Sequence, residues 1–383
     1  MNILLVTETY LPFISGVSTS TDSIAKYMVS RGHKVTIFCP EPVLKKPVPE
    51  FPGLRICCSP SVPDLFYRGK PWTIFPLAIL PLRRLIKKNK FDVIHIQEPG
   101  SVGLSALILS KIYKIPTVGA LHFTPEQIGR MIPGKPEKLV KPFIELYIKF
   151  IYNLYTAIMV PTATFSKFLK MVGVAKPVVV VSNGVDTNRF SPGPKNFSLR
   201  KKYHISDDDV VFFFLGRLDR DKNVATLVKA IPYTHKQIKL LIVGSGKIED
   251  YLHKLAADLN VNNKIIWITH IDEEDMPGFY HMADCFSIMS PYEVQSIVTL
   301  QAIASGLPVI AANTGALPEL VNNFQNGYLV DVYDYKTLAK RMDILAREPK
   351  MRDNFSKTSR QMSLKHNKST VLKKLEDLYL SLG

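Results

Sequence analysis

The chain has 383 residues, of which 46% are hydrophobic and 21% are charged, a balance that excludes a disordered chain, a collagen and a disulfide scaffold. Lysine and arginine outnumber aspartate and glutamate by 49 to 33, and residues 1–190 carry +13 of the net charge of +16. A basic half attracts nucleic acid, an anionic membrane surface or phosphorylated ligands. Because aromatic interleaving of the RNA-binding kind and zinc-finger spacings are absent from the sequence, we expect no nucleic-acid partner.

The first half of the chain alternates short apolar runs with helical stretches. The opening MNILLVTETY has no basic segment before its apolar run, so it is interpreted as a strand and not as a signal peptide. Helices are expected at Thr19–Arg31 and Val102–Ile112. Strands are expected at Asn2–Thr7, Lys34–Phe38, Val93–Ile96, Pro116–Leu121, Ala157–Val160 and Val178–Val181.

The second half repeats this rhythm after a break at residues 191–198, where two prolines and a glycine indicate a linker. Helices are expected at Asn223–Ile231, Ile248–Leu259 and Val298–Ser305. Strands are expected at Val210–Leu215, Lys239–Val243, Lys264–Thr269, Cys285–Met289, Pro308–Ala311 and Gly327–Val330.

The βαβ rhythm predicts an α/β chain of two Rossmann-like, doubly wound domains that face each other across a cleft. Several of the strands are apolar throughout, as in parallel sheets covered on both faces. We expect the first domain at residues 1–190 and the second at 199–365, with residues 366–383 packing back on the first. The cysteines, Cys39, Cys57, Cys58 and Cys285, lack metal-ligand spacing, so reduced thiols and no metal are expected.

Two strand-to-helix loops have the features of phosphate sites. After the first strand, Gly16 allows close backbone approach just before a helix, whose first amides attract anions. After the first strand of the second half, the segment GRLDRDKN places Arg217 and Lys222 where two cations can neutralise a diphosphate without a metal. Gly244, in VGSGK, indicates a further place where a nucleotide can approach the backbone closely, although the third glycine of a dinucleotide fingerprint is missing.

The most specific pattern follows the strand that ends at Met289. Glu293 lies just ahead of a helix whose first amides, at Ser296, Ile297 and Val298, would point at an anion, and Gln301 lies about one turn further. The spacing allows one ligand to meet both side chains. Exposed Glu and Gln residues on a helix are also common without any ligand.

Together these segments resemble those of the retaining glycosyltransferases of family 4, which have the GT-B fold. The resemblance is carried by ISGV, by SNGVD at 182–186, by GRLDRDKN at 216–223, and by an E-x7-E-type segment at Glu293 followed by AIASGLPVIAANTGALPELV. It extends from residue 7 to about residue 331.

The resemblance implies a nucleotide-diphosphate sugar as donor and no further cofactor. Arg217 and Lys222 match the pair that holds the diphosphate, Glu293 matches the residue that contacts sugar hydroxyls, and His122 matches a histidine beside the transferred sugar. The family's second Glu, which binds the ribose, is Gln301 here, which implies a weaker ribose contact. The other positions implied to lie against the donor are Gly16, Val17, Gly244, Ile268, Thr269, Gln295, Ser296, Ile297 and Val298.

The acceptor is expected at the first domain. Residues 136–155 place apolar and aromatic side chains at helical spacing between Lys135, Lys138, Lys141 and Lys149, and residues 82–90 add five basic ones. Such a helix suits an anionic membrane interface, although a core-facing stripe with solvated lysines would look the same. ISGVSTS and the segment from Glu293 to Ser296 also resemble segments of glucosyltransferases acting on diacylglycerol and related lipids, with Val294 and Ser296 in place of Thr and Gly.

The prediction is a hexosyltransferase that uses a UDP-glucose or GDP-mannose type donor. Its acceptor would be a membrane lipid such as diacylglycerol, a glycolipid or phosphatidylinositol. Its expected location is the cytoplasm, peripherally on the inner face of the cell membrane. Two alternatives stay open: the same chemistry on a soluble or polysaccharide acceptor, and a non-catalytic nucleotide-sugar-binding protein.

Overall fold

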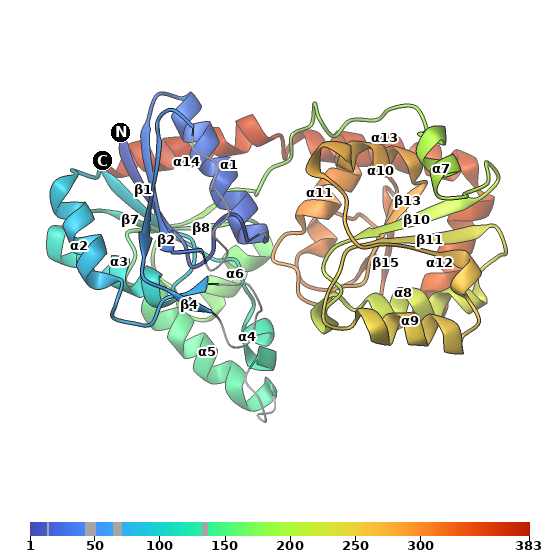
Figure 1. Cartoon of the computed structure of the whole chain (residues 1–383), viewed down its shortest axis with the longest axis horizontal. Coiled ribbons are helices and arrows are strands. Elements are labelled where there is room, and N and C mark those ends of the chain that lie inside the picture. Colours follow the sequence, from blue (N-terminus) through green and yellow to red (C-terminus); the bar gives the residue numbers. More distant parts are fainter. Residues whose placement is uncertain (14, 43–50, 64–70, 132–136) are drawn as a thin grey trace. The chain divides into compact units, whose positions relative to one another are not determined.

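The computed structural model describes residues 1–13, 15–42, 51–63, 71–131 and 137–383 (Figure 1). Ile14, Lys135 and Pro136, which entered the expectations above, lie outside the described residues, as does the side chain of Lys138. The chain forms two compact units, Met1–Asn183 with Ser369–Gly383, and Gly184–Lys368. The boundary therefore lies before the expected linker, and residues 191–198 belong entirely to the second unit.

The reason for the earlier boundary is that the Pro/Gly-rich segment packs instead of linking. His281 Nε2 lies 2.8 Å from the Ser191 carbonyl oxygen, and the Asn196 amide donates to the His281 carbonyl at 3.2 Å. A side chain at Gly193 would meet the imidazole of His281 at 2.8 Å. The composition of this segment thus reflects close packing against the second unit.

The first unit is built on a parallel seven-stranded sheet in the order β3-β2-β1-β6-β7-β8-β9. A separate short hairpin pairs β4 with β5. The strands are β1 (Asn2–Val6), β2 (Lys34–Pro40), β3 (Leu54–Ser59), β4 (Val62–Pro63), β5 (Pro71–Trp72), β6 (Val93–Ile96), β7 (Thr117–Ala120), β8 (Ala157–Val160) and β9 (Val178–Val180).

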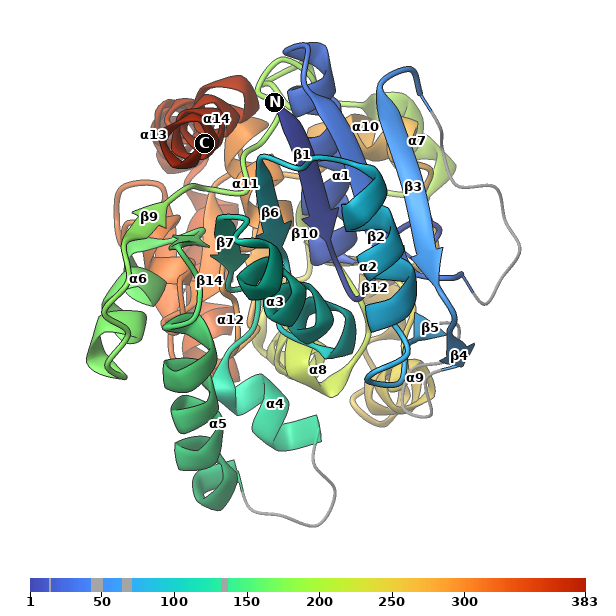
Figure 2. The same ribbon diagram turned by 90° about the vertical axis from the view of Figure 1, so that its left-hand side faces the viewer.

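Helices cover this sheet, and α2 and α3 lie side by side on it (Figure 2). The helices are α1 (Gly16–Ser30), α2 (Ile79–Lys88), α3 (Ser101–Tyr113), α4 (Pro125–Met131), α5 (Glu137–Tyr152), α6 (Ala163–Met171) and α14 (Lys368–Leu382). The last helix, α14, returns to this unit, where Val371, Leu372, Leu375 and Tyr379 share one buried cluster with Ile24, Ala25 and Met28 of α1 (Figure 1).

The second unit is built on a parallel six-stranded sheet in the order β12-β11-β10-β13-β14-β15. Its strands are β10 (Val210–Leu215), β11 (Ile238–Val243), β12 (Ile265–Ile268), β13 (Cys285–Ile288), β14 (Val309–Ala312) and β15 (Gly327–Val330). Its helices are α7 (Phe197–Lys202), α8 (Val224–Ala230), α9 (Glu249–Asp258), α10 (Met276–Met282), α11 (Ile297–Ala304), α12 (Tyr335–Arg347) and α13 (Pro349–Leu364).

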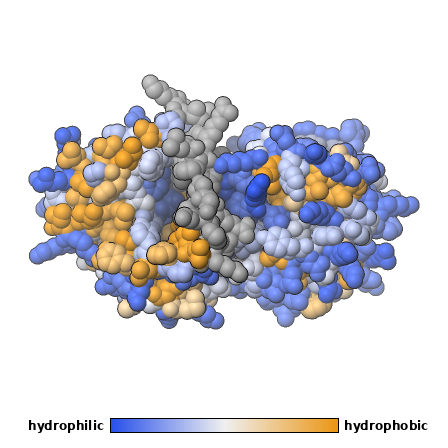
Figure 3. Space-filling view, turned by 90° about the horizontal axis from the view of Figure 1, so that it is seen from below, coloured by the Kyte–Doolittle hydropathy of each residue, from blue (hydrophilic) through white to orange (hydrophobic). Residues whose placement is uncertain are grey.

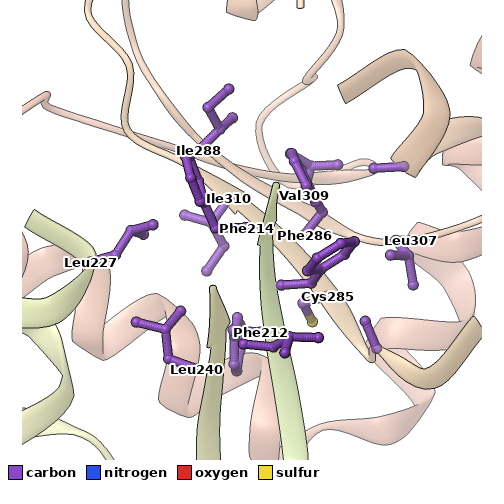
Figure 4. Packing of buried hydrophobic residues seen from close by; sticks show 14 of the residues in the cluster. Phe212, Phe214, Leu227, Leu240, Cys285, Phe286, Ile288, Leu307, Val309 and Ile310 are labelled. Atoms are coloured by element: carbon purple, nitrogen blue, oxygen red, sulfur yellow. The ribbon is translucent and has the colours of Figure 1, made fainter. Parts of the chain in front are cut away.

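The core of the second unit is dominated by neighbouring strands that are apolar along their whole length. Phe212, Phe214, Leu240, Phe286 and Ile310 are all fully buried and pack together (Figure 4). Phe213, which lies between Phe212 and Phe214 and points to the other face of β10, is also fully buried, so this strand is covered on both faces, as parallel sheets between helices require. This core supports the loops at the carboxyl ends of the strands.

Both sheets reverse their strand order beside their first strand. β1 lies between β2 and β6, and β10 lies between β11 and β13. Open parallel sheets bind ligands beyond the carboxyl ends of strands at such switch points. The residues expected from the sequence to bind donor or sugar lie at the carboxyl end of β12, in loops after β1, β7, β10, β11, β12 and β13, or in the first turns of the helix that follows.

Two sequence expectations need correction. Helix α1 begins at Gly16, three residues before the expected start, because Ser15 caps it and exchanges bonds with Ser18 in a capping box. Strand β3 was not expected, because its half-exposed residues Leu54–Ser59 lie at the sheet edge and lack the continuous apolar run of the central strands.

Candidate active site

An ion pair joins the loop after β10 to the loop after β13. Lys222 Nζ lies 2.6 Å from Glu293 Oε1, and the two side chains are 21% and 10% exposed. Asn223, at φ +50°, fixes the first loop by donating from its amide to the carbonyl oxygens of Met289 at 3.1 Å and Val332 at 2.8 Å. The two residues that the sequence analysis placed at the diphosphate and the sugar are therefore in direct contact.

Glu293 is held from behind by the turn after β14. The Ala316 amide donates to the Glu293 carbonyl at 3.0 Å, and Gly315 has φ +57°. A Cβ at Gly315 would come 2.8 Å from that same carbonyl oxygen, so only glycine fits this approach. Gly315 is thus a positioning element for Glu293.

Arg217 is the more exposed cation of the site. Its guanidinium forms ion pairs with Asp219 and, at 3.2 Å, with Asp221, and its side chain is 47% exposed. Asp219 also accepts a hydrogen bond from the Lys247 amide at 3.0 Å, which ties the loop after β10 to the loop after β11. To bind a phosphate, Arg217 would exchange these two carboxylates for phosphate oxygens of the same geometry.

Helix α11 offers two amides at its amino end. Ser296, 3% exposed, caps the helix and accepts from the Thr299 amide at 3.2 Å. No acceptor for the amides of Ile297 and Val298 is found in the part of the chain that the structure describes. Gln295 is 7% exposed beside them. A free pair of amides at a helix start favours an anion there.

Gln301 is bonded to a residue that the sequence analysis did not include. The hydroxyl of Tyr280, a fully buried residue on α10, lies 2.9 Å from Gln301 Oε1 and 3.1 Å from the Val298 carbonyl oxygen, so its one proton is shared between these two acceptors. Burial raises the pKa of this phenol well above its ordinary value, so it stays a donor. With Oε1 engaged, the Gln301 amide group remains as a donor to a ligand. The pattern of the sequence gives no sign of Tyr280, because it lies on a different helix.

Gly244 has a structural reason to be glycine. It has φ +142°, and a Cβ there would come 1.9 Å from the Gly216 carbonyl oxygen. Its amide donates to the Ile268 carbonyl at 2.8 Å, which joins the ends of β11 and β12. Thr269 is exposed directly after β12. The structure thus groups Gly244, Ile268 and Thr269, and the glycine serves this packing whether or not a nucleotide approaches.

In the first unit, the start of α1 is open. Ser15 caps the Ser18 amide, and Gly16 and Val17 are the first two helical residues. A Cβ at Gly16 would meet nothing within 4 Å, and its φ is not in the left-handed region. The chain itself therefore does not require glycine at position 16, which is consistent with a role in admitting a ligand.

His122 follows β7 in the first unit and donates from Nε2 to Gln97 Oε1 at 2.9 Å. Burial lowers the pKa of His122 to about 4, so the ring is neutral at pH 7 and its Nδ1 is unprotonated. An unprotonated ring nitrogen accepts a hydrogen bond from a hydroxyl. This makes His122 an acceptor and gives it no proton to donate from Nδ1.

A glutamate at the end of β1 was also missed. Glu8 Oε1 accepts from the amides of Val102 at 2.8 Å and Gly103 at 2.9 Å, so it caps α3. Its place directly after the first strand, at the switch point, was the available signal.

Among the described residues, no group of three or more His, Cys, Asp or Glu side chains is arranged to hold a metal ion.

Two family models match the chain and together cover most of it. Glycosyltransferase Family 4 matches residues 14–189, and Glycosyl transferases group 1 matches residues 195–362. The chain belongs to these glycosyltransferases. It is 24% identical to an alpha-monoglucosyldiacylglycerol synthase of Acholeplasma laidlawii, over all of this chain and 97% of that protein.

A second relative of this glycosyltransferase has a different named substrate. The chain is 27% identical, over 86% of its length and 85% of the other protein, to a GDP-mannose-dependent alpha-(1-6)-phosphatidylinositol monomannoside mannosyltransferase of Mycobacterium tuberculosis. The names of the two relatives contain different lipids, diacylglycerol and phosphatidylinositol.

Solved structures support the GT-B fold. Sucrose-phosphate synthase from Thermosynechococcus elongatus matches with a TM-score of 0.87 at 18% identity, over all of this chain and 99% of the other. HepE from Anabaena, solved in complex with UDP, matches with a TM-score of 0.80 at 19% identity, over the whole of both chains. At these identities the likeness establishes the two Rossmann-like units and the fold.

Proposed function

We propose that this glycosyltransferase transfers a hexose, with retention of configuration, from a nucleotide-diphosphate sugar to a membrane lipid. The lipid part of the proposal is carried by one observation, a row of exposed apolar side chains on α5. Leu139, Phe143, Leu146 and Phe150 are 63–74% exposed and follow one another at helical spacing.

The donor part of the proposal is supported by the charges at the carboxyl ends of β10 and β13. Arg217 and Lys222 would bind the diphosphate, together with the free amides of Ile297 and Val298. Glu293, held by Lys222 and Gly315, would accept hydrogen bonds from hydroxyls of the sugar. A related structure was solved with UDP, and a relative is named as GDP-mannose-dependent.

In this proposal the chain accelerates transfer by stabilising charge and by positioning. The two cations and the helix amides stabilise the negative charge that develops on the departing diphosphate. His122 accepts a hydrogen bond from the sugar and needs no proton change. The leaving phosphate takes the proton of the acceptor hydroxyl, and Glu293 holds the sugar in place for attack.

Helix α5 supports both interpretations of its sequence, because its two faces differ. Ile144, Ile148, Ile151 and Tyr152 are buried in the first unit, and the apolar row on the opposite face is exposed. Exposed apolar residues also lie on α2 and α3, which pack against each other, among them Leu80, Ile108 and Ile112. Figure 3 shows hydrophobic residues spread over the visible face of the first unit, on the left.

The charge of the first half favours an anionic membrane as the partner of this surface. Residues 1–190 carry a net +13, and the exposed end of α2 carries Arg83, Arg84, Lys87 and Lys88. Lys141 of α5 contributes less, because it pairs with Glu126 at 2.7 Å. No helix among the described residues is long and apolar enough to cross a bilayer. We therefore propose peripheral binding at the inner face of the cell membrane.

One mass-spectrometric assay tests the proposal. The purified protein is mixed with UDP-glucose, UDP-galactose, UDP-N-acetylglucosamine or GDP-mannose, and with anionic vesicles that contain diacylglycerol and phosphatidylinositol. The expected product is a lipid heavier by one hexose residue, with an α linkage by NMR. Release of nucleotide diphosphate without a modified lipid would favour a soluble or polysaccharide acceptor. No turnover with donors that bind would favour a non-catalytic nucleotide-sugar-binding protein.

A further inference from the structure

A row of polar side chains leads from His122 into the core of the first unit. Gln97 and His95, at the carboxyl end of β6, are fully buried, and so is Tyr379 of α14. Polar groups so far from water lower stability unless each has a hydrogen-bond partner. These residues find their partners in one another, across three elements that are distant in sequence.

The contacts are continuous. His122 Nε2 lies 2.9 Å from Gln97 Oε1, and Gln97 Nε2 lies 3.2 and 3.3 Å from the two ring nitrogens of His95. His95 Nδ1 lies 2.5 Å from the hydroxyl oxygen of Tyr379. We call His122, Gln97, His95 and Tyr379 the polar row.

The bond to Gln97 decides where the proton of His122 lies. An amide oxygen only accepts, so His122 must donate from Nε2. Burial lowers the pKa of His122 to about 4 and that of His95 to about 3, so both rings hold a single proton at pH 7. The single proton of His122 is therefore on Nε2, and Nδ1 has a free lone pair.

We propose that Gln97 is a positioning residue for glycosyl transfer. It holds His122 with the proton on Nε2, so that Nδ1 accepts a hydrogen bond from a hydroxyl of the transferred sugar. His95 and Tyr379 act through Gln97 by fixing the position of its amide group. This inference rests on the proposed function, in which His122 contacts the sugar.

Stability alone does not account for the polar row. Replacing hydrogen-bonded partners together by apolar groups of similar shape can be nearly neutral. Apolar side chains at the positions of the polar row would therefore stabilise the folded state as well. The neighbouring residues Ile94 and Ile96 on β6 are of this kind, since both are apolar and fully buried. The polar row instead passes through the carboxyl end of β6, beside the switch point of the sheet, and its outer end is His122, the residue expected to contact sugar.

The kinetic test uses two variants of the polar row and one control. Gln97→Met removes the acceptor of His122 with little change in volume, and Tyr379→Phe removes one hydroxyl at the far end. We expect kcat to fall about 10- to 100-fold in Gln97→Met, by analogy with the loss of a supporting hydrogen bond to a metal-binding histidine. A smaller fall is expected in Tyr379→Phe, and the donor KM should stay within about twofold in both.

The control is Tyr155→Phe, which removes a hydroxyl from an equally buried tyrosine of the same unit outside the polar row. It should leave kcat unchanged. Thermal unfolding of every variant separates lost turnover from lost folding. A donor KM that rises with kcat unchanged would contradict positioning of His122.

A spectroscopic measurement needs no substrate. In protein labelled with ¹⁵N-histidine, protonated and bare ring nitrogens have well-separated chemical shifts, and His122→Ala assigns the signals of His122. The wild type is expected to show Nε2 protonated and Nδ1 bare at pH 7. Gln97→Met should give a mixture of tautomers. A wild-type proton on Nδ1 would overturn the proposal, even if Gln97→Met does not fold.

The His122→Ala variant separates the failure of this inference from that of the proposed function. If His122→Ala retains full turnover, the sugar contact of the proposed function is wrong and the positioning role falls with it. If His122→Ala abolishes turnover but Gln97→Met and Tyr379→Phe match the wild type, only the positioning role is wrong. The double variant Gln97→Met/His122→Ala should be no slower than His122→Ala alone, because both changes remove one interaction.

Discussion

The contact between Lys222 and Glu293 gives the donor site its most testable pair of residues. Glu293→Ala and Lys222→Ala are each expected to lower the stabilisation of the transition state by ~2–4 kcal/mol, as the loss of one electrostatic contact does. Because the side chains lie 2.6 Å apart, their effects should not add. Measurement of kcat/KM for both single variants and the double variant gives the coupling energy.

Arg220→Ala is the matched control for this pair. Arg220 is an exposed basic residue of the same short segment, Arg220–Lys222, and it has no assigned contact with the donor. It should keep kcat/KM within about twofold, as surface substitutions away from a site do. Near-normal turnover in both Glu293→Ala and Lys222→Ala would show that the reaction occurs elsewhere.

Gln301 provides a test of ribose binding. In Gln301→Glu, the Tyr280 hydroxyl can donate to one carboxylate oxygen and the other can accept from the ribose with charge assistance. We expect nucleotide affinity, measured by calorimetry with UDP and GDP, to be preserved or to rise by ~1 kcal/mol. Gln237→Glu adds the same charge at an exposed position before β11 and should change nothing. A large loss of affinity in Gln301→Glu would mean that Gln301 makes another contact.

At the scale of residues, the sequence predicted which loops carry functional side chains but not what holds them. Lys222 and Glu293 were assigned to separate parts of one donor, and the structure adds their ion pair. Gln97 and Tyr280 were missed because their partners come from elements far away in the chain, which no local pattern encodes. Gly244 was interpreted as an approach site, and the structure adds a backbone contact that requires glycine.

At the scale of elements, helix α5 is the part to test for membrane binding. Phe143 and Phe150 are 74% and 66% exposed, and we expect the double variant Phe143→Ser/Phe150→Ser to sediment about tenfold less with anionic vesicles. The estimate follows from removing two large apolar side chains from a membrane interface. Sedimentation with phosphatidylglycerol vesicles at low and high salt measures the loss and its electrostatic share.

Phe197→Ser serves as the control for the apolar row of α5. Phe197, on α7 of the second unit, is 54% exposed and should not affect vesicle binding. Activity on a short-chain, water-soluble analogue of the acceptor should survive in all three proteins if α5 only docks. Equal vesicle binding by wild type and the α5 double variant would exclude α5 as the docking element.

The helix boundaries show which signals in the sequence were sufficient to predict where a helix begins and ends. Helix α3 and helix α9 lie within one residue of the expected bounds, because their apolar spacing is regular. The start of α1 depends on the reciprocal hydrogen bonds of Ser15 and Ser18. In the sequence, a serine at the last position of this capping box is a weaker signal than the usual glutamate. Helix α5 looked ambiguous because it is apolar on two faces, one buried and one exposed.

At the scale of the whole molecule, the two units should differ in their response to acid. The pKa values of His95 and His122 are lowered by burial to about 3 and about 4 from an ordinary 6.5. Between pH 6.5 and about 3 the unfolded first unit therefore binds protons that the folded unit does not, and its stability falls as pH falls. Above pH 6.5 both histidines are neutral in the folded and in the unfolded state, so they contribute no pH dependence to the free energy of unfolding. We expect the first unit to unfold first on acidification.

The two tryptophans allow each unit to be followed separately. Trp72 belongs to the first unit and Trp267 to the second, and the chain has no others. Fluorescence of Trp267→Phe should report acid unfolding at a higher pH than fluorescence of Trp72→Phe. Simultaneous transitions, or an earlier loss of the second unit, would contradict the assignment of acid sensitivity to His95 and His122.

The general architecture was predictable from the sequence because the strands are short, apolar and regularly separated by helices. Two parallel sheets of this kind are what the structure contains. The boundary between the units was not predictable from composition, because residues 191–198 look like a linker and yet pack on His281. The real crossing, at Asn183 and Gly184, has no such composition.

The return of α14 to the first unit sets an order of events during synthesis. The second unit, Gly184–Lys368, is one uninterrupted stretch, so it can complete its fold as soon as it leaves the ribosome. The first unit is begun earlier, but its core lacks Leu375 and Tyr379 until α14 emerges. Of the two units, the one that is begun first is thus completed second. A ribosome that stops before α14 would release a chain with a complete second unit and with a first unit whose core is incomplete.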